Sequence, residues 1–160
     1  MTVRDEILGA NERHASQFDK GDLRGVPGRR FAVVTCMDAR LDPARFLGLE
    51  EGDAHVIRNA GGLVTDDALR SLVISHHELG TQEVLVIGHE GCGMLQLSNE
   101  RLRAQLGPAA AEMDFLGFSD LDEAVRRSVR KVRESPLLPD SFAASGFVYD
   151  VRNGRLREVT

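Results

Sequence analysis

Short apolar runs bounded by turn residues recur along the chain and predict a buried sheet. The three clearest runs are 30–36, 54–58 and 83–88. They are rich in β-branched residues and lack strict polar alternation, which is typical of parallel strands covered on both faces. A fourth strand is predicted over 146–151. It continues through Asn153-Gly154 into 155–159, because Asn-Gly favours a hairpin turn.

Windows with helical spacing lie before and between these runs. They cover residues 2–19, 66–79, 94–106 and 120–134. Thr65 is a predicted N-cap, and Ser119 with Asp122 matches a capping box. Because strands alternate with helices, we predict an α/β fold: a mainly parallel central sheet, flanked by helices on both faces, with a C-terminal β-hairpin.

Length and charge narrow the class of protein. A chain of 160 residues fits one domain, predicted here over 1–160. The net charge of −5, without a concentrated basic block, argues against nucleic-acid or membrane partners. The polar start and the lack of a long apolar run predict a cytoplasmic location. Two cysteines in such a chain are expected to be free thiols, metal ligands or catalysts.

Both cysteines follow predicted strands. Cys36 ends the first run, while His89 and Cys92 follow the third. Because active sites form where parallel strands end, these side chains are candidates for one site. Two thiolates and an imidazole make a Cys₂His zinc site whose fourth position is open. The alternative is that the cysteines are small core residues and the histidine is a satisfied polar group.

An acid and a base accompany Cys36. Asp38 and Arg40 stand two residues apart and can pair on one face of an extended segment. An ordinary surface ion pair is the simpler interpretation. Beside a metal ligand, however, such a pair suits a dyad that orients the reacting groups.

Three segments then carry a resemblance to a known family. Cys36-x-Asp38-x-Arg40, Arg58-Asn59-Ala60-Gly61-Gly62 and Gly88-His89-x-x-Cys92-Gly93 resemble, in order and spacing, the motifs of the β-class carbonic anhydrases. The likeness is strong over residues 30–95. It implies a zinc enzyme with the metal on Cys36, His89 and Cys92 and with Asp38 and Arg40 as catalytic residues. The implied substrate pocket contains Arg58, Asn59, Ala60, Gly61, Gly62 and Gly93.

The family implies reversible hydration of CO2 to bicarbonate by a zinc-activated hydroxide. It also implies a homodimer or homotetramer, in which we expect the N-terminal segment 1–19 to pack on a partner subunit. The same scaffold is similar to that of carbonyl sulfide and carbon disulfide hydrolases, which stay an alternative. A non-catalytic zinc protein, with Asp38 filling the fourth position, is a further one. Val33 stands where a bicarbonate-regulated subgroup carries tryptophan, so that regulatory site is not expected here.

Overall fold

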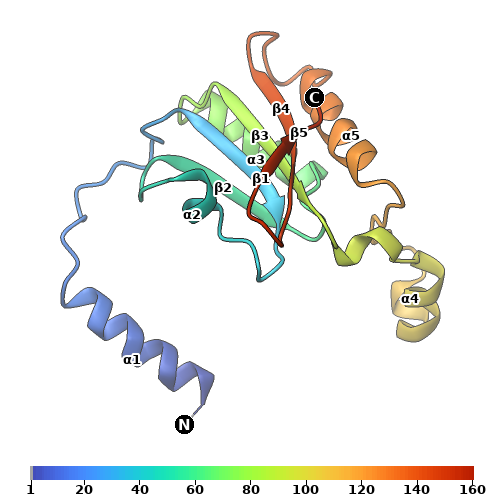
Figure 1. Ribbon diagram of the computed structural model, residues 1–160, viewed down its shortest axis with the longest axis horizontal. Helices are drawn as coiled ribbons and strands as arrows, with labels where there is room; N and C mark the ends of the chain where they lie inside the picture. Colours follow the sequence, from blue (N-terminus) through green and yellow to red (C-terminus); the bar gives the residue numbers. More distant parts are fainter. Residues whose placement is uncertain (1) are drawn as a thin grey trace.

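The computed structural model describes residues 2–160 and contains one five-stranded sheet (Figure 1). The strands are β1 (Phe31–Cys36), β2 (Ala54–Asn59), β3 (Glu83–His89), β4 (Ala143–Tyr149) and β5 (Leu156–Glu158). The α-helices are α1 (Val3–Ala15), α2 (Pro43–Leu47), α3 (Asp66–His77), α4 (Asn99–Leu106) and α5 (Leu121–Arg133). Two 3₁₀ turns, η1 (Gly93–Gln96) and η2 (Pro108–Ala110), flank α4.

The sheet has the strand order β2-β1-β3-β4-β5, and its first four strands are parallel. Only β5 runs antiparallel to its neighbour. The chain leaves β1 toward one edge of the sheet and leaves β3 toward the other. The strand order therefore reverses between β1 and β3, and ligand sites form at such a point in open α/β sheets.

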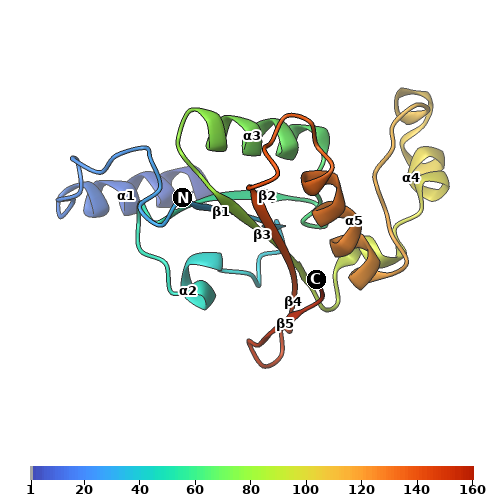
Figure 2. The same ribbon diagram turned by 90° about the horizontal axis from the view of Figure 1, so that it is seen from above.

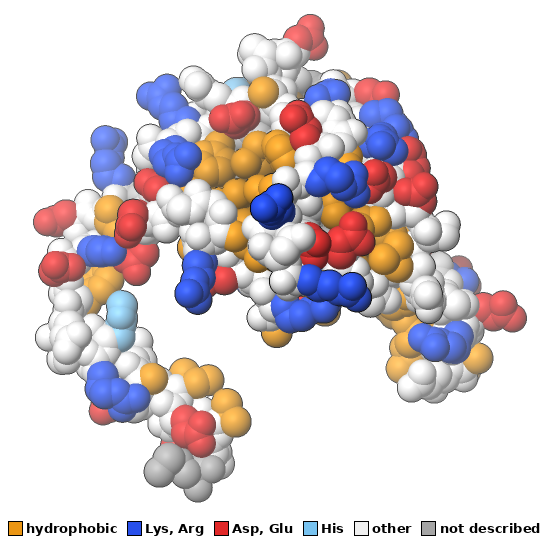
Figure 3. Space-filling view, in the orientation of Figure 1, with side chains coloured by type: hydrophobic (Ala, Val, Ile, Leu, Met, Phe, Trp, Pro, Cys, Tyr) orange, Lys and Arg blue, Asp and Glu red, His pale blue; other side chains and the backbone are white. Residues whose placement is uncertain are grey.

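The two faces of the sheet are covered unequally. Figure 2 shows α3 and α5 together on one face and the short α2 alone on the other. Right-handed crossovers require this arrangement. The connection from β1 to β2 crosses the sheet in one direction, whereas the connections from β2 to β3 and from β3 to β4 cross it in the opposite direction. The face beside α2 keeps apolar side chains at its surface (Figure 3). Leu85 and Phe147 are half-buried and pack against the cluster that contains Val33. The predicted α/β fold is thus confirmed.

The core explains why the apolar runs become strands. All six residues of β1 are buried. Its alternate residues Ala32, Val34 and Cys36 join the core under α3 and α5, whereas Phe31 and Val33 pack beneath α2. Because both faces of β1 are buried, apolar and polar residues do not alternate along it, as the sequence pattern predicted.

Several predicted boundaries are wrong. The first helix ends at Ala15 rather than 19, and Met1 lies outside the described residues. The single helix expected over 94–106 is broken, since η1 ends at Gln96 and α4 begins only after its N-cap Ser98. Ser119 does not cap α5, because Asp120 accepts the hydrogen bond from the Glu123 N–H instead.

The sequence pattern also did not reveal helix α2 or the length of the connection between β4 and β5. Asp42 caps α2, Pro43 starts it, and Gly48 ends it in a left-handed conformation, which are ordinary start and stop signals. The C-terminal hairpin is confirmed, but its connection spans residues 150–155. Asp150 organises this loop by accepting from the N–H of Arg152 and the amide of Asn153.

Helix α1 stands apart from the sheet in Figure 1, and none of its residues is buried. The irregular segment 16–30 joins it to β1. Among residues 2–160, every helix is too short or too polar to cross a membrane.

Candidate metal centre

The reversal point between β1 and β3 brings the predicted metal ligands together. Cys36 is the last residue of β1, His89 is the last residue of β3, and Cys92 precedes η1. Their potential ligand atoms all lie within 4.8 Å of one another, and all three residues are buried. Within residues 2–160 this is the one group of His, Cys, Asp or Glu with such a geometry.

Two glycines allow this close approach. Gly62 has a φ of +65°, and a Cβ there would lie 2.8 Å from the Cys36 nitrogen and 3.1 Å from the Ile87 carbonyl. Gly88, just before His89, would place a Cβ 2.8 Å from Val125 of α5. Any larger residue would push the loop after β2, or helix α5, away from the strand ends.

The orientation of the His89 ring leaves one nitrogen free for a cation. Its Nδ1 lies 3.0 Å from the Glu90 carbonyl, an acceptor, so Nδ1 carries the hydrogen. Nε2 is therefore unprotonated in the neutral ring, and it is buried without a hydrogen-bond partner. Such an orphaned atom is costly unless it binds something. Two sulfurs and one imidazole nitrogen fit zinc.

The two thiols influence each other directly. A hydrogen bond from Cys92 lowers the pKa of Cys36 despite its burial. The same contact and burial raise the pKa of the Cys92 thiol above its ordinary value. The two thiols thus share one proton between them more readily than they hold two, and a bound cation would favour the thiolate of both.

Asp38 and Arg40 form the predicted pair at the edge of the metal group. Arg40 donates from Nε to Asp38 Oδ1 at 2.9 Å and from Nη2 to Oδ2 at 2.8 Å. These bonds, with one from the Arg40 N–H, hold the pKa of Asp38 well below its usual value. Asp38 Oδ2 also lies 3.7 Å from His89 Nε2. The carboxylate is therefore ionised and adjoins the metal group.

Arg40 makes a further contact that the sequence did not indicate. Its Nη2 donates to the Gly91 carbonyl at 3.1 Å, in the loop between His89 and Cys92. The guanidinium thus bridges the loop after β1 to the loop after β3. The partner is a backbone carbonyl, so no side-chain pattern could have revealed it.

The remaining predicted pocket residues divide into loop-forming and exposed ones. Asn59 closes the loop after β2, because its amide bonds the Leu63 carbonyl and N–H at 2.8 and 2.9 Å. The Gly61 backbone helps to lower the pKa of Cys36. Ala60 and Gly93 are exposed. Arg58 donates to backbone carbonyls of the loop after β1.

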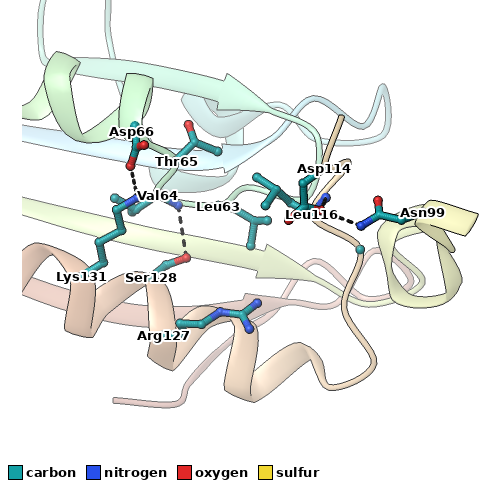
Figure 4. A pocket seen from close by; sticks show the side chains of 11 residues that line it. Leu63, Val64, Thr65, Asp66, Asn99, Asp114, Leu116, Arg127, Ser128 and Lys131 are labelled. Atoms are coloured by element: carbon teal, nitrogen blue, oxygen red, sulfur yellow. Dashed lines mark hydrogen bonds and ion pairs between the residues drawn. The ribbon is translucent and has the colours of Figure 1, made fainter. Parts of the chain in front are cut away.

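The loop after β2 is also fastened to α5, a role for Ser128 that the sequence did not reveal. Figure 4 shows the cavity of about 490 Å³ where these segments meet. Ser128 accepts a hydrogen bond from the Val64 N–H at 3.2 Å, and Lys131 pairs with Asp66 at 2.6 Å. These contacts hold the loop that carries Gly61 and Gly62 in place.

The other histidines serve the scaffold. His55 Nδ1 lies 2.7 Å from the Ser75 hydroxyl, His76 Nδ1 contacts the Thr81 carbonyl, and His77 Nε2 contacts the Leu137 carbonyl. His14 packs on Phe18. None belongs to the metal group, as expected for the adjacent His76-His77 pair on a helix.

The fold and this site define a class: α/β proteins with a buried Cys-His-Cys group at the strand reversal point. The family model described as "Carbonic anhydrase" matches residues 31–117. The chain is 43% identical to "Beta-carbonic anhydrase 1" of Mycobacterium tuberculosis, over 100% of this chain and 99% of that protein. It therefore belongs to the β-carbonic anhydrase family, as the motifs predicted, and its predicted class, the carbonate dehydratase lyases, is confirmed.

Solved structures agree with this assignment. The crystal structure of carbonic anhydrase from Streptococcus mutans superposes with a TM-score of 0.93 and 44% identity, covering 100% of this chain and 99% of that one. The family scaffold also occurs in a protein named "Carbon disulfide hydrolase" from Acidianus sp., which is 36% identical over 96% of this chain and 89% of its own length.

Proposed function

We propose that this protein hydrates CO2 reversibly to bicarbonate and a proton, using zinc held by Cys36, His89 and Cys92. The observation that carries the proposal is the buried, unpartnered Nε2 of His89 beside two thiols. Bound there, zinc would supply a Lewis acid that ionises water near neutral pH. The coordination by two thiolates and one imidazole would leave a fourth position for reactants.

Asp38 is the proposed orienting base. Arg40 keeps its carboxylate ionised and fixes both oxygens by side-chain hydrogen bonds. From the edge of the metal group, Asp38 can accept a hydrogen bond from the attacking water and direct an oxygen lone pair at the carbon of CO2. Arg40, through Gly91, holds this carboxylate against the loop that carries the other two ligands.

Stopped-flow CO2 hydration by protein of verified zinc content tests this function. We expect turnover that rises from neutral to mildly alkaline pH, because two anionic sulfurs reduce the acidity of water at the metal. Asp38→Ala should retain zinc and lose turnover by about a hundredfold or more. Asp19→Ala is the control, because Asp19 lies in the exposed linker and its side chain forms no hydrogen bond or ion pair in the described chain. Full turnover of Asp38→Ala would remove Asp38 from the mechanism.

Zinc binding is tested separately by metal analysis. We expect one ion per chain, lost on treatment with a strong chelator. Cys36→Ser should lose zinc and activity while keeping its circular dichroism spectrum, because the core around Cys36 consists mostly of aliphatic side chains from the strands and from α5. Unfolding of this variant would indicate a structural rather than a catalytic zinc.

Carbon disulfide hydrolysis is the second candidate, because a relative with that name shares the scaffold at 36% identity. The metal ligands do not discriminate between CO2 and carbon disulfide. Both are linear triatomic molecules, and in both the nucleophile attacks the central carbon. Measuring CO2, carbonyl sulfide and carbon disulfide turnover on one zinc-verified preparation decides between them. An enzyme inert toward CO2 and active on the sulfur compounds would overturn the first assignment.

We also propose a homodimer or homotetramer in which α1 packs on a partner subunit. Its apolar residues Val3, Ile7 and Leu8 are 70%, 61% and 48% exposed. A helix of 13 residues is marginal in water without tertiary packing. Removal of residues 1–19 should therefore lower the mass measured by light scattering. An unchanged mass would reject this role for α1.

A cytoplasmic location is the last part of the proposal. Both cysteines are free and close enough to share an ion. A reducing compartment keeps such thiols available to zinc. Cell fractionation tests this location.

A further inference from the structure

Arg58 is the penultimate residue of the edge strand β2, and its side chain reaches the end of β1 at Cys36 and the following loop at Asp38. Its Nε donates to the Cys36 carbonyl at 3.0 Å, and its Nη2 donates to the Asp38 carbonyl at 2.8 Å. One planar guanidinium therefore binds two backbone oxygens two residues apart. Because its donors are rigidly spaced, this fork fixes the distance between the two carbonyls.

The two carbonyls flank the turn in which the chemistry lies. Cys36 supplies a sulfur to the metal group, and Asp38 supplies the carboxylate beside it. Between them, the Met37 N–H donates to the Asn59 carbonyl. Arg58 and the adjacent Asn59 thus anchor this turn to the end of β2 from one side.

Arg40 anchors the same turn from the other side. Its side chain donates hydrogen bonds to the Asp38 carboxylate and the Gly91 carbonyl, whereas the Arg58 side chain donates to main-chain oxygens. In residues 2–160, Arg58 forms no ion pair with a carboxylate. Its specific contacts are therefore the two carbonyls, and a salt bridge does not account for its placement.

We propose that Arg58 is a positioning residue that sets the geometry of the Cys36–Asp38 turn, and with it the placement of one metal ligand and the orienting carboxylate. The sequence motif grouped Arg58 with the substrate pocket. The observed hydrogen bonds instead join its Nε and Nη2 to the backbone carbonyls of Cys36 and Asp38. This inference rests on the proposed metal site but not on CO2 being the substrate.

The test compares Arg58→Met, which removes the donors, with Arg58→Lys, which keeps the charge but can reach only one carbonyl well. Arg45→Met is the matched control, since Arg45 lies exposed on α2 and its side chain has no hydrogen bond or ion pair in the described chain. The first readout is the zinc dissociation constant from chelator competition. The second is the absorption spectrum of the protein loaded with cobalt(II) alone, which reports the coordination geometry.

We expect Arg58→Met to weaken zinc binding by about tenfold, as for other groups that orient a ligand, and to alter the cobalt spectrum. In CO2 hydration, kcat should fall while KM changes little, because the turn and not a substrate contact is disturbed. Arg58→Lys should recover part of both effects. Arg45→Met should match the unaltered protein in every readout.

Two results would overturn the assignment. Wild-type zinc affinity and cobalt spectrum in Arg58→Met would show that the turn holds its geometry without the fork. A raised KM with unchanged kcat would make Arg58 a substrate contact. Thermal unfolding of the metal-free variants separates a general loss of fold from a local one, and Arg58→Lys provides the same test if Arg58→Met does not fold. Since the zinc and cobalt readouts need no turnover, they remain decisive if the protein proves inactive on CO2.

Discussion

Helices α1 and α5 have the same length but differ in how much of their surface is buried. Each has 13 residues and an N-cap side chain, Thr2 for α1 and Asp120 for α5, that accepts a backbone hydrogen bond. Six residues of α5 are buried against the sheet, whereas none of α1 is. Good local signals are thus sufficient to start a helix, but they do not determine what it packs on.

The difference lies in the surface that each helix meets. Buried residues of α5, including Leu121, Val125 and Val129, recur at helical spacing. Val125 and Val129 fit over Gly88 and Gly146, where a Cβ would come within 3.2 Å of them. Each buried aliphatic side chain contributes roughly 1.5–3 kcal/mol. The apolar residues of α1 are exposed, so we expect its stability to depend on a partner.

The largest effect should come from placing a charge on each helix. Val129→Asp buries a carboxylate without a partner, because Val129 is 1% exposed. We expect a loss of about 4 kcal/mol or more, or failure to fold, measured by urea denaturation. The matched Ile7→Asp variant should keep the stability of the sheet domain and instead weaken self-association. Equal destabilisation by the two variants would show that α1 is as integral to the core as α5.

A smaller effect should follow from removing each N-cap. Asp120→Ala should cost about 1 kcal/mol of global stability, since the first turn of α5 must form for its core contacts to exist. Thr2→Ala removes the corresponding cap and half of a capping box with Asp5. We expect it to reduce helix content by circular dichroism without moving the urea midpoint of the sheet domain. A shifted midpoint for Thr2→Ala would contradict the independence of α1.

The smallest effect should appear at acid pH. The hydrogen bonds and charge of Arg157 lower the pKa of Asp122 in the first turn of α5. A lowered folded-state pKa stabilises the fold above the unfolded pKa, near about 4, and this contribution is lost as pH falls through the folded pKa.

Asp122→Asn should therefore lower stability at neutral pH by about 0.5–1 kcal/mol, and the difference should shrink below about pH 4. In α1, Thr2 lowers the pKa of Asp5 by hydrogen bonding, but Asp5 lies exposed at the surface. Asp5→Asn should leave the denaturation curve of the sheet domain unchanged at both pH values. A constant gap between Asp122→Asn and the unaltered protein across this range would exclude the Arg157 pair as its source.

Much of the site could be predicted because its members follow apolar runs. Cys36 and His89 end buried strands, and the ends of neighbouring parallel strands must meet. Asp38 and Arg40 are two residues apart, so their pairing is a local matter. The break between η1 and α4 could not be seen in the same way. Residues 94–106 favour a helix locally, and the Phe118 N–H, 24 positions along the chain from Met94, bonds the Met94 carbonyl.

The amino-acid sequence alone determined the strands, most helices, the candidate ligands and the family resemblance, because hydrophobic periodicity and short motifs express local preferences. Only the tertiary structure decided that Arg58 binds the Cys36 and Asp38 carbonyls, that His89 keeps Nε2 free, and that no residue of α1 is buried in the described part of the chain. The physical reason is that these outcomes depend on backbone atoms and surfaces from distant segments. Their positions follow from the packing of the whole chain.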